Sequence, residues 1–334
     1  MRVTMPWSRE LPLVTACFAL ACPSADGGGG GSSTGESTGS STSTTATSAT
    51  TTMSSTSSAD SSSTGADSGT GGTASTSESS ASTTDAPPLD VAVVADCEPG
   101  SKPGAAGNTD GWVNDFGVLV NLRMPAAYDP TVAVPLVVVY APAGADAGLT
   151  EQFTGLTEPT LAQGWAIAYV DHITPMSVQV VADASVIPGL IAAQWCIDPD
   201  RIYLTGHSDG GTIAEVSINV AVDPPLPRAA APSAAGITGS TLAQVGCPDH
   251  AVSMMIMHST GDALFPVAEG FGADAAQFWA DCNGCAGDPV DDGTCATWSM
   301  CDDGTSVAYC EGAGVHGQWP GLDDEILAFF AANG

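Results

Sequence analysis

Basic residues are scarce in this chain. It has 6 lysines and arginines against 37 aspartates and glutamates among 334 residues, which gives a formal net charge of −31 at pH 7. Nucleic acids and anionic membrane surfaces are bound by cationic side chains that neutralise phosphate. The composition therefore excludes nucleic acid as a partner and favours a neutral substrate. The same acidity also suits a protein that only needs to stay soluble outside the cell.

A hydrophobic run long enough for a permanent membrane span is also lacking in the first residues. The apolar run from Leu11 to Ala21 follows Arg2 and Arg9. This run is shorter than the ~20 residues that a transmembrane helix needs. A positively charged start followed by a short apolar run predicts an export signal over residues 1–22.

A cysteine ends this apolar run. The residues Ala19-Leu20-Ala21-Cys22 resemble the lipobox of bacterial lipoproteins, in which the cysteine is lipid-modified after cleavage. Cys17 is a rival site behind a shorter apolar run. We expect Cys22 to be the lipid anchor and the protein to touch a membrane only through it, so that it is held at the bacterial cell envelope or surface. Without the anchor, the protein would be secreted.

Apolar residues are few between positions 23 and 88, where the chain is nearly all Ser, Thr, Gly and Ala. Such a segment cannot offset its ordering entropy by burying apolar surface, and it shows no hydrophobic period. It predicts a disordered stalk. The mixed composition of residues 89–334 predicts one catalytic domain, and the chain has no internal repeats.

Cysteine is well represented. Beyond Cys17 and Cys22 the chain keeps an even set of cysteines, at positions 97, 196, 247, 282, 285, 295, 301 and 310. An even set in an exported protein predicts disulfides, whose pairing the sequence leaves open. A zinc ribbon built on Cys282, Cys285, Cys295 and Cys301 is the alternative. The oxidising compartment disfavours it.

Apolar runs of strand length alternate with helix-like segments in the predicted domain. Short β-branched runs bounded by turns are typical of strands that are buried on both faces. Alternation of β and α elements predicts an α/β domain with a mostly parallel sheet covered on both faces. The expected strands are 116–124, 135–140, 165–170, 201–205 and 252–258, and the expected helices are 151–163, 181–194, 211–222, 276–281 and 323–332.

One short motif in this arrangement indicates chemistry. The run Gly206-His207-Ser208-Asp209-Gly210 follows the strand 201–205 and precedes a small-residue helix. That context is what a nucleophile elbow requires, because glycines let strand and helix approach around a sharp turn. Ser208 is therefore the expected nucleophile, and the N–H of Asp209 is expected to face the oxyanion.

A serine nucleophile needs a histidine base and a carboxylate that orients it, and in this fold they follow the serine in the order acid, then histidine. His250 and His258 lie before or at the end of the strand 252–258, so His316 alone comes late enough to be the base. Asp262 lies just past that strand, at the carboxyl edge of the sheet that also holds Ser208. It is the expected orienting acid.

Several segments together resemble the exported poly(3-hydroxybutyrate) depolymerase and feruloyl or acetylxylan esterase group. These segments are Asp198–Gly211, the strand that ends at His258 with Gly261-Asp262, Phe278–Cys285 and Trp319–Gly321. The resemblance covers about residues 116–330, with the elements in matching order.

The resemblance implies an α/β-hydrolase that cleaves carboxylic esters through an acyl-enzyme, with Ser208 as nucleophile, His316 as base and Asp262 as orienter. It also implies two disulfides, Cys285 with Cys301 and Cys97 with Cys196. This chemistry requires no metal and no organic cofactor. The acidic turns 291–293 and 302–304 lack the alternating oxygen-ligand spacing of calcium loops.

Two departures from the family pattern concern the site. Where the family usually has a His-Gly pair after the second strand, this chain has Ala141-Pro142-Ala143. Proline has no N–H, so the second oxyanion donor is expected to be the N–H of Ala143. His316 also stands three residues before Trp319, where the family usually has two, so the local loop must bulge.

These features leave three functions open. The first is a serine esterase that acts on a neutral polymer or oligomer ester, such as a polyhydroxyalkanoate or a feruloyl or acetyl polysaccharide. The second is a catalytically lapsed surface-binding lipoprotein on the same fold, which the changed loop at Ala141-Pro142 motivates. The third is acyl transfer or peptide hydrolysis by the same triad, because acceptor and acyl pocket are set by loops. The sequence does not indicate the oligomeric state.

Overall fold

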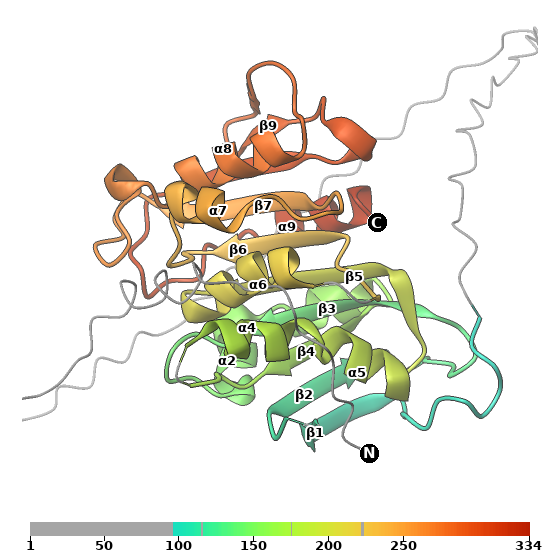
Figure 1. The fold of residues 1–334 in the computed structure, drawn as a ribbon. Coiled ribbons are helices and arrows are strands. Elements are labelled where there is room, and N and C mark those ends of the chain that lie inside the picture. Colours follow the sequence, from blue (N-terminus) through green and yellow to red (C-terminus); the bar gives the residue numbers. More distant parts are fainter. Residues whose placement is uncertain (1–95, 115, 175, 222–223) are drawn as a thin grey trace, which may run out of the picture. The chain divides into compact units, whose positions relative to one another are not determined.

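The structure is a computed structural model of the chain, and it describes residues 96–334 apart from 115, 175, 222 and 223 (Figure 1). The predicted export signal, the stalk and the candidate anchor cysteines Cys17 and Cys22 lie outside the described residues. No helix in the described part is long and apolar enough to cross a membrane.

The described strands form one ten-stranded sheet in the order β1-β2-β4-β3-β5-β6-β7-β10-β9-β8. Its six central strands, from β4 to β10, are parallel, and the strands at both ends are antiparallel. The strands are β1 (Gly107–Val113), β2 (Leu119–Met124), β3 (Val134–Tyr140), β4 (Ala166–Val170), β5 (Ile197–His207), β6 (Ala229–Ser233), β7 (Ser253–Ser259), β8 (Val290–Asp291), β9 (Ala296–Trp298) and β10 (Val307–Gly312).

Helices cover both faces of this sheet (Figure 1). One face packs against α4 (Val178–Ser185), α5 (Ile187–Gln194), α6 (Asp209–Val220), α7 (Gly239–Val245) and α8 (Ala273–Cys282). The other face packs against α2 (Ala147–Thr154), the start of α3 (Thr157–Ala162) and α9 (Asp323–Ala332). Two short 3-10 turns, η1 (Val267–Glu269) and η2 (Asp302–Gly304), lie in the connections.

Strand β3 shows how the sequence builds two cores. Successive side chains of a strand point to opposite faces. Leu136, Val138 and Tyr140 accordingly join the core on the α6 face, whereas Val137 and Val139 join the core on the α9 face. The continuous apolar run of β3 is thus needed because both faces are buried, as expected from the sequence.

The predicted helix 151–163 is wrong in one respect, because it is two helices. Gly155 ends α2 with a φ of 66°, a left-handed conformation that terminates a helix, and α3 begins two residues later. The predicted helix 181–194 is likewise divided into α4 and α5, where Pro188 falls in the first turn of the second helix.

All eight cysteines among residues 96–334 form disulfides. The pairs are Cys97–Cys196, Cys247–Cys282, Cys285–Cys301 and Cys295–Cys310, and they include both pairs that the family resemblance implies. The cysteines considered for a zinc ribbon are therefore used in covalent bonds. In the described part of the chain, no group of three or more His, Cys, Asp or Glu side chains is placed to hold a metal ion.

Candidate active site

Ser208 lies on a sharp turn between β5 and α6. Its backbone has φ 57° and ψ −120°, a conformation that costs a non-glycine residue about 1–3 kcal/mol. Two hydrogen bonds hold it: the N–H of Ser208 donates to the carbonyl of Ser233 at 3.0 Å, and the N–H of Thr212 donates to the carbonyl of Ser208 at 2.9 Å. The serine is thereby presented at the carboxyl edge of the sheet.

The glycines around Ser208 are required by close backbone approaches. A Cβ atom on Gly206 would lie 2.5 Å from the backbone of Gly210. A Cβ on Gly210 would overlap the carbonyl of Tyr140, and a Cβ on Gly211 would overlap the carbonyl of Ser233. Only glycine at these positions lets α6 start directly against the sheet, as a nucleophile elbow requires.

His316 connects Ser208 to Asp262. Its Nε2 lies 2.9 Å from Oγ of Ser208, and its Nδ1 lies 2.7 Å from Oδ2 of Asp262. An ionised carboxylate can only accept, so Nδ1 carries the proton and donates it to Asp262. Nε2 is then free to accept the hydroxyl proton of Ser208, which is the arrangement of a serine nucleophile with its base.

Asp262 is buried but stays charged. Its side chain has no solvent exposure, and its Oδ1 accepts the N–H groups of Leu264 at 2.9 Å and Phe265 at 2.8 Å. Burial would raise the pKa of Asp262, but the hydrogen bonds from Phe265 and His316 outweigh burial and hold this pKa below its ordinary value. The carboxylate can therefore orient the imidazole and stabilise its positive charge.

The loop that carries His316 is closed by a tight turn. The N–H of Gln318 donates to the carbonyl of Val315 at 3.1 Å, and the amide oxygen of Gln318 accepts the N–H of Val315 at 3.1 Å. The ring of Trp319 follows the turn and donates from Nε1 to Asp323 at 2.8 Å. The turn lies between His316 and Trp319, where the family resemblance predicts one extra residue and a bulge.

A second histidine, His207, holds the loop that carries His316 through a hydrogen bond to its backbone. Its Nε2 lies 2.5 Å from the carbonyl of His316 and must donate to it, so its Nδ1 accepts the hydroxyl of Ser233 at 3.0 Å. Burial lowers the pKa of His207 to about 4, although the hydrogen bond to His316 opposes this shift. His207 is therefore neutral near pH 7. No sequence pattern indicates this role, because His207 occupies the variable position of the motif.

His258 supports the acid and is no candidate for the base. Its Nε2 donates to the carbonyl of Phe265 at 2.8 Å and lies 3.6 Å from Oδ2 of Asp262. Burial lowers the pKa of His258, so the ring is neutral and fixes the loop that holds Asp262.

The two predicted oxyanion donors lie on neighbouring segments. Gly206 of β5 is paired with Tyr140 of β3, so the turn after β3 lies beside the elbow. This turn is closed by a hydrogen bond from Ala145 to Pro142 at 3.1 Å, with Gly144 at a φ of 77°. Within residues 96–334 the N–H groups of Asp209 and Ala143 donate no hydrogen bond to the protein. Both remain available to a substrate oxygen.

A further histidine, which no sequence pattern indicates, contacts Asp209, the residue after Ser208. His172 follows β4, and its Nε2 lies 3.0 Å from Oδ2 of Asp209. Neither partner is near the other in sequence, so no spacing pattern could have paired them.

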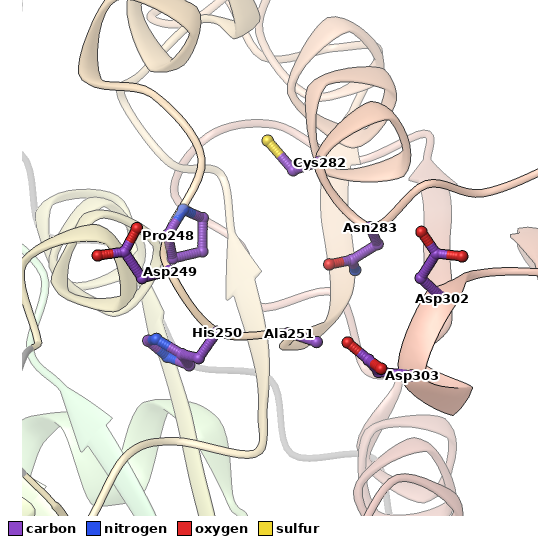
Figure 2. A pocket seen from close by; sticks show the side chains of 8 residues that line it. All are labelled: Pro248, Asp249, His250, Ala251, Cys282, Asn283, Asp302 and Asp303. Carbon is purple, nitrogen blue, oxygen red and sulfur yellow. The ribbon is translucent and has the colours of Figure 1, made fainter.

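An acidic hollow at the opposite edge of the sheet does not contribute to this site. It has a volume of about 190 Å³ and lies at the amino end of β7 (Figure 2). Figure 2 shows Asp302 and Asp303 on one side of it, and Asp249 and His250 on the other. The hollow contains carboxylates but no serine, and Ser208 lies at the other end of the parallel strands.

Comparisons with known proteins identify the fold. No protein-family model and no curated protein sequence matches the chain. Among solved structures, it is similar to an acetyl xylan esterase from Aspergillus awamori, with a TM-score of 0.53 and 14% identity over 69% of this chain and 100% of that one. It also resembles a truncated carbohydrate esterase from gut microbiota, with a TM-score of 0.45 and 14% identity over 71% of this chain and 99% of that one.

The parallel sheet, the helices on both faces and the first of these similarities show that the chain has the α/β-hydrolase fold. At this level of identity the similarity concerns the fold alone. The closer resemblance to poly(3-hydroxybutyrate) depolymerases stays a prediction from the sequence.

Proposed function

We propose that the protein is a serine carboxylic-ester hydrolase that acts through an acyl-enzyme. The observation that carries the proposal is the unbroken hydrogen-bonded chain from Ser208 through His316 to the buried carboxylate of Asp262. The three residues come from separate segments, at the turn after β5, the turn after β7 and the loop after β10. Apolar side chains would pack better at this position, because burial of polar groups costs free energy. The meeting of these three polar side chains is therefore better explained by catalysis than by packing.

The reaction follows from this geometry. Oγ of Ser208 attacks the ester carbonyl carbon while Nε2 of His316 takes the hydroxyl proton, and Asp262 stabilises the imidazolium. The N–H groups of Asp209 and Ala143 hold the oxyanion of the tetrahedral intermediate. The intermediate collapses as the C–O bond to the alcohol breaks and His316 protonates the leaving oxygen. Water, deprotonated by His316, then attacks the acyl carbon, which releases the acid and returns the proton to Ser208.

A neutral polymer or oligomer ester is the proposed substrate, either a polyhydroxyalkanoate or a feruloyl or acetyl polysaccharide. Leu264 and Val315, which adjoin the acid and base loops in sequence, are exposed apolar side chains at 46% and 53% exposure. A hollow of about 560 Å³ beside the His316 loop is lined in part by Phe153 and Trp319. Apolar and aromatic surface beside the site, in a protein with a net charge of −31, favours uncharged substrates.

Hydrolysis of defined esters tests the proposal. The wild type should hydrolyse some of a set of p-nitrophenyl esters of graded acyl length, methyl ferulate, acetylated xylan and polyhydroxybutyrate. Ser208→Ala should lose this activity by at least about 10³-fold. Ser101→Ala, which alters an exposed serine in the segment before β1, is the matched control and should keep it. A folded wild type that hydrolyses none of these esters would favour the surface-binding alternative.

We also propose that the protein is exported and anchored to the cell envelope through Cys22. The four disulfides support export, because disulfides persist in oxidising compartments. Metabolic labelling with palmitate tests the anchor. Cys22→Ala should abolish incorporation, whereas loss of label in Cys17→Ala alone would assign the anchor to the rival cysteine.

A further inference from the structure

Asp209 places a carboxylate beside the oxyanion site. Its backbone N–H is one of the two proposed oxyanion donors, and its side chain branches from the Cα atom bonded to that nitrogen. A negative charge close to a developing oxyanion opposes catalysis, and it is screened less by water when it is partly buried. The Asp209 side chain is only 18% exposed, so the direction in which its carboxylate points matters for the proposed reaction.

His172 fixes that direction. Its Nε2 donates to Oδ2 of Asp209 at 3.0 Å, and its ring is only 9% exposed. The imidazole belongs to the loop after β4, whereas Asp209 is the first residue of α6, so the hydrogen bond joins this loop to the start of α6.

The same loop also holds the segment that carries the other oxyanion donor. The backbone N–H of His172 donates to the carbonyl of Ala145 at 3.3 Å, in the turn that contains Ala143. Oδ1 of the neighbouring Asp171 accepts the N–H of Ala147 at 2.7 Å. The pair of residues 171 and 172 therefore contacts both donor-bearing segments.

We propose that His172 is a positioning residue of the oxyanion hole. Its hydrogen bond to Oδ2 of Asp209 sets the direction of this carboxylate relative to the oxyanion and connects the segments that carry the Asp209 and Ala143 donors. The inference rests on the proposed esterase function and deepens it. His172 touches neither substrate nor Ser208 in this account, and it acts through Asp209 and the turn after β3.

Removal of the imidazole frees the carboxylate of Asp209. In His172→Ala this charge is no longer held and is able to turn toward the oxyanion site, where it raises the energy of the transition state more than that of the bound ester. We therefore expect kcat on p-nitrophenyl acetate to fall about 10- to 100-fold, with KM changed less than about threefold. Replacement by Gln, whose amide also donates, should keep kcat within about fivefold of the wild type.

A double-mutant cycle separates this role from simple packing. If the freed charge causes the loss, His172→Ala should cost much less in an Asp209→Asn background than in the wild type. If His172 only fills space, the cost should be the same in both backgrounds. His250→Ala is the matched control, because it removes a partly buried histidine at the opposite edge of the sheet, and it should leave kcat within about twofold.

Thermal unfolding of every variant checks that the fold is kept. The inference is overturned if folded His172→Ala retains the wild-type kcat, or if Asp209→Asn fails to reduce the cost of that substitution. Both results require an active wild type, so they leave the esterase proposal standing. A wild type that is folded and inactive on all esters overturns the esterase proposal and this inference together.

Discussion

His207 shows how a residue outside the proposed triad sets the position of His316, the proposed base. It donates to the carbonyl of His316 and accepts from Ser233, so the His316 loop is attached to β5, which ends next to Ser208, and to β6. Its burial keeps the ring neutral, with the pKa lowered to about 4. The ring can therefore hold the same pair of hydrogen bonds at every pH well above 4.

Substitution of His207 should lower kcat. In His207→Leu the carbonyl of His316 loses its donor and the base is free to shift, and a shift of the order of 1 Å costs about 10²-fold in rate. His207→Gln, which can still donate an amide N–H, should lose less. Steady-state kinetics on p-nitrophenyl esters measures both. Equal losses of kcat in the two variants, or no loss in His207→Leu, would contradict this role of His207.

The sequence predicts the three side chains that the structure joins by hydrogen bonds, Ser208, His316 and Asp262, but not the residues that support them. Ser208, Asp262 and His316 each follow a recognisable strand or precede the last helix, so their chain order placed them at one edge of the sheet. His172 and His207 act through contacts with residues 37 and 109 positions away. Such contacts depend on how the loops pack, which no local pattern encodes.

At the scale of elements, the central strands followed from their composition. Val134–Tyr140 and Ser253–Ser259 are apolar runs close to the predicted ranges 135–140 and 252–258. Strand β2 begins at Leu119, after the predicted start at 116, because the side chain of Asn114 accepts the N–H groups of Phe116 and Val118 and folds that segment into a turn. Strand β6, Ala229–Ser233, was missed because its alanines and proline carry no strand signal.

Helix α6 contains a buried carboxylate that has no part in the proposed reaction. Glu215 is fully buried, and its Oε1 accepts the indole N–H of Trp279 on α8 at 2.8 Å. Burial raises the pKa of Glu215 from 4.5 to about 7, which the bond from Trp279 only partly offsets. A raised pKa in the folded state means that stability is fully present below pH 4.5 and is lost as the pH rises through about 7.

Glu215→Gln should therefore stabilise the protein in alkaline solution. The amide oxygen can keep the hydrogen bond from Trp279, and no charge has to be buried. The raised pKa of Glu215 corresponds to about 3 kcal/mol in the free energy of unfolding above pH 7. Near pH 4.5 the substitution should change this free energy little. Urea unfolding at pH 5 and pH 8.5 measures the difference, with exposed Glu158→Gln as control. A gain that does not grow with pH would contradict this account of Glu215.

At the scale of the whole molecule, one disulfide closes a long stretch of the described chain. Cys97 precedes β1 and is bonded to Cys196, 99 positions away at the start of β5. A covalent link across a loop of this length restricts the unfolded chain strongly, by about 4–5 kcal/mol in the chain-entropy treatment. The bond thus ties the first segment of the domain to its central strands.

Removal of this disulfide should destabilise the domain more than removal of a short-range one. Cys97→Ala with Cys196→Ala should lower the free energy of unfolding by about 4 kcal/mol, against about 3 kcal/mol for the Cys295–Cys310 pair, whose separation is 15. Denaturant unfolding of both double variants gives the comparison. A larger loss for the short-range pair would show that native packing, and not loop closure, decides the effect.

The central claim is that Ser208 is a nucleophile activated by His316 and Asp262, and covalent trapping tests it most directly. Intact-mass and peptide mass spectrometry after incubation with a fluorophosphonate should show one adduct, on the peptide that contains Ser208. Ser208→Ala should show none, and His316→Ala should react at least about 10²-fold more slowly. A folded wild type that gains no adduct, or gains it on another serine, would contradict the account.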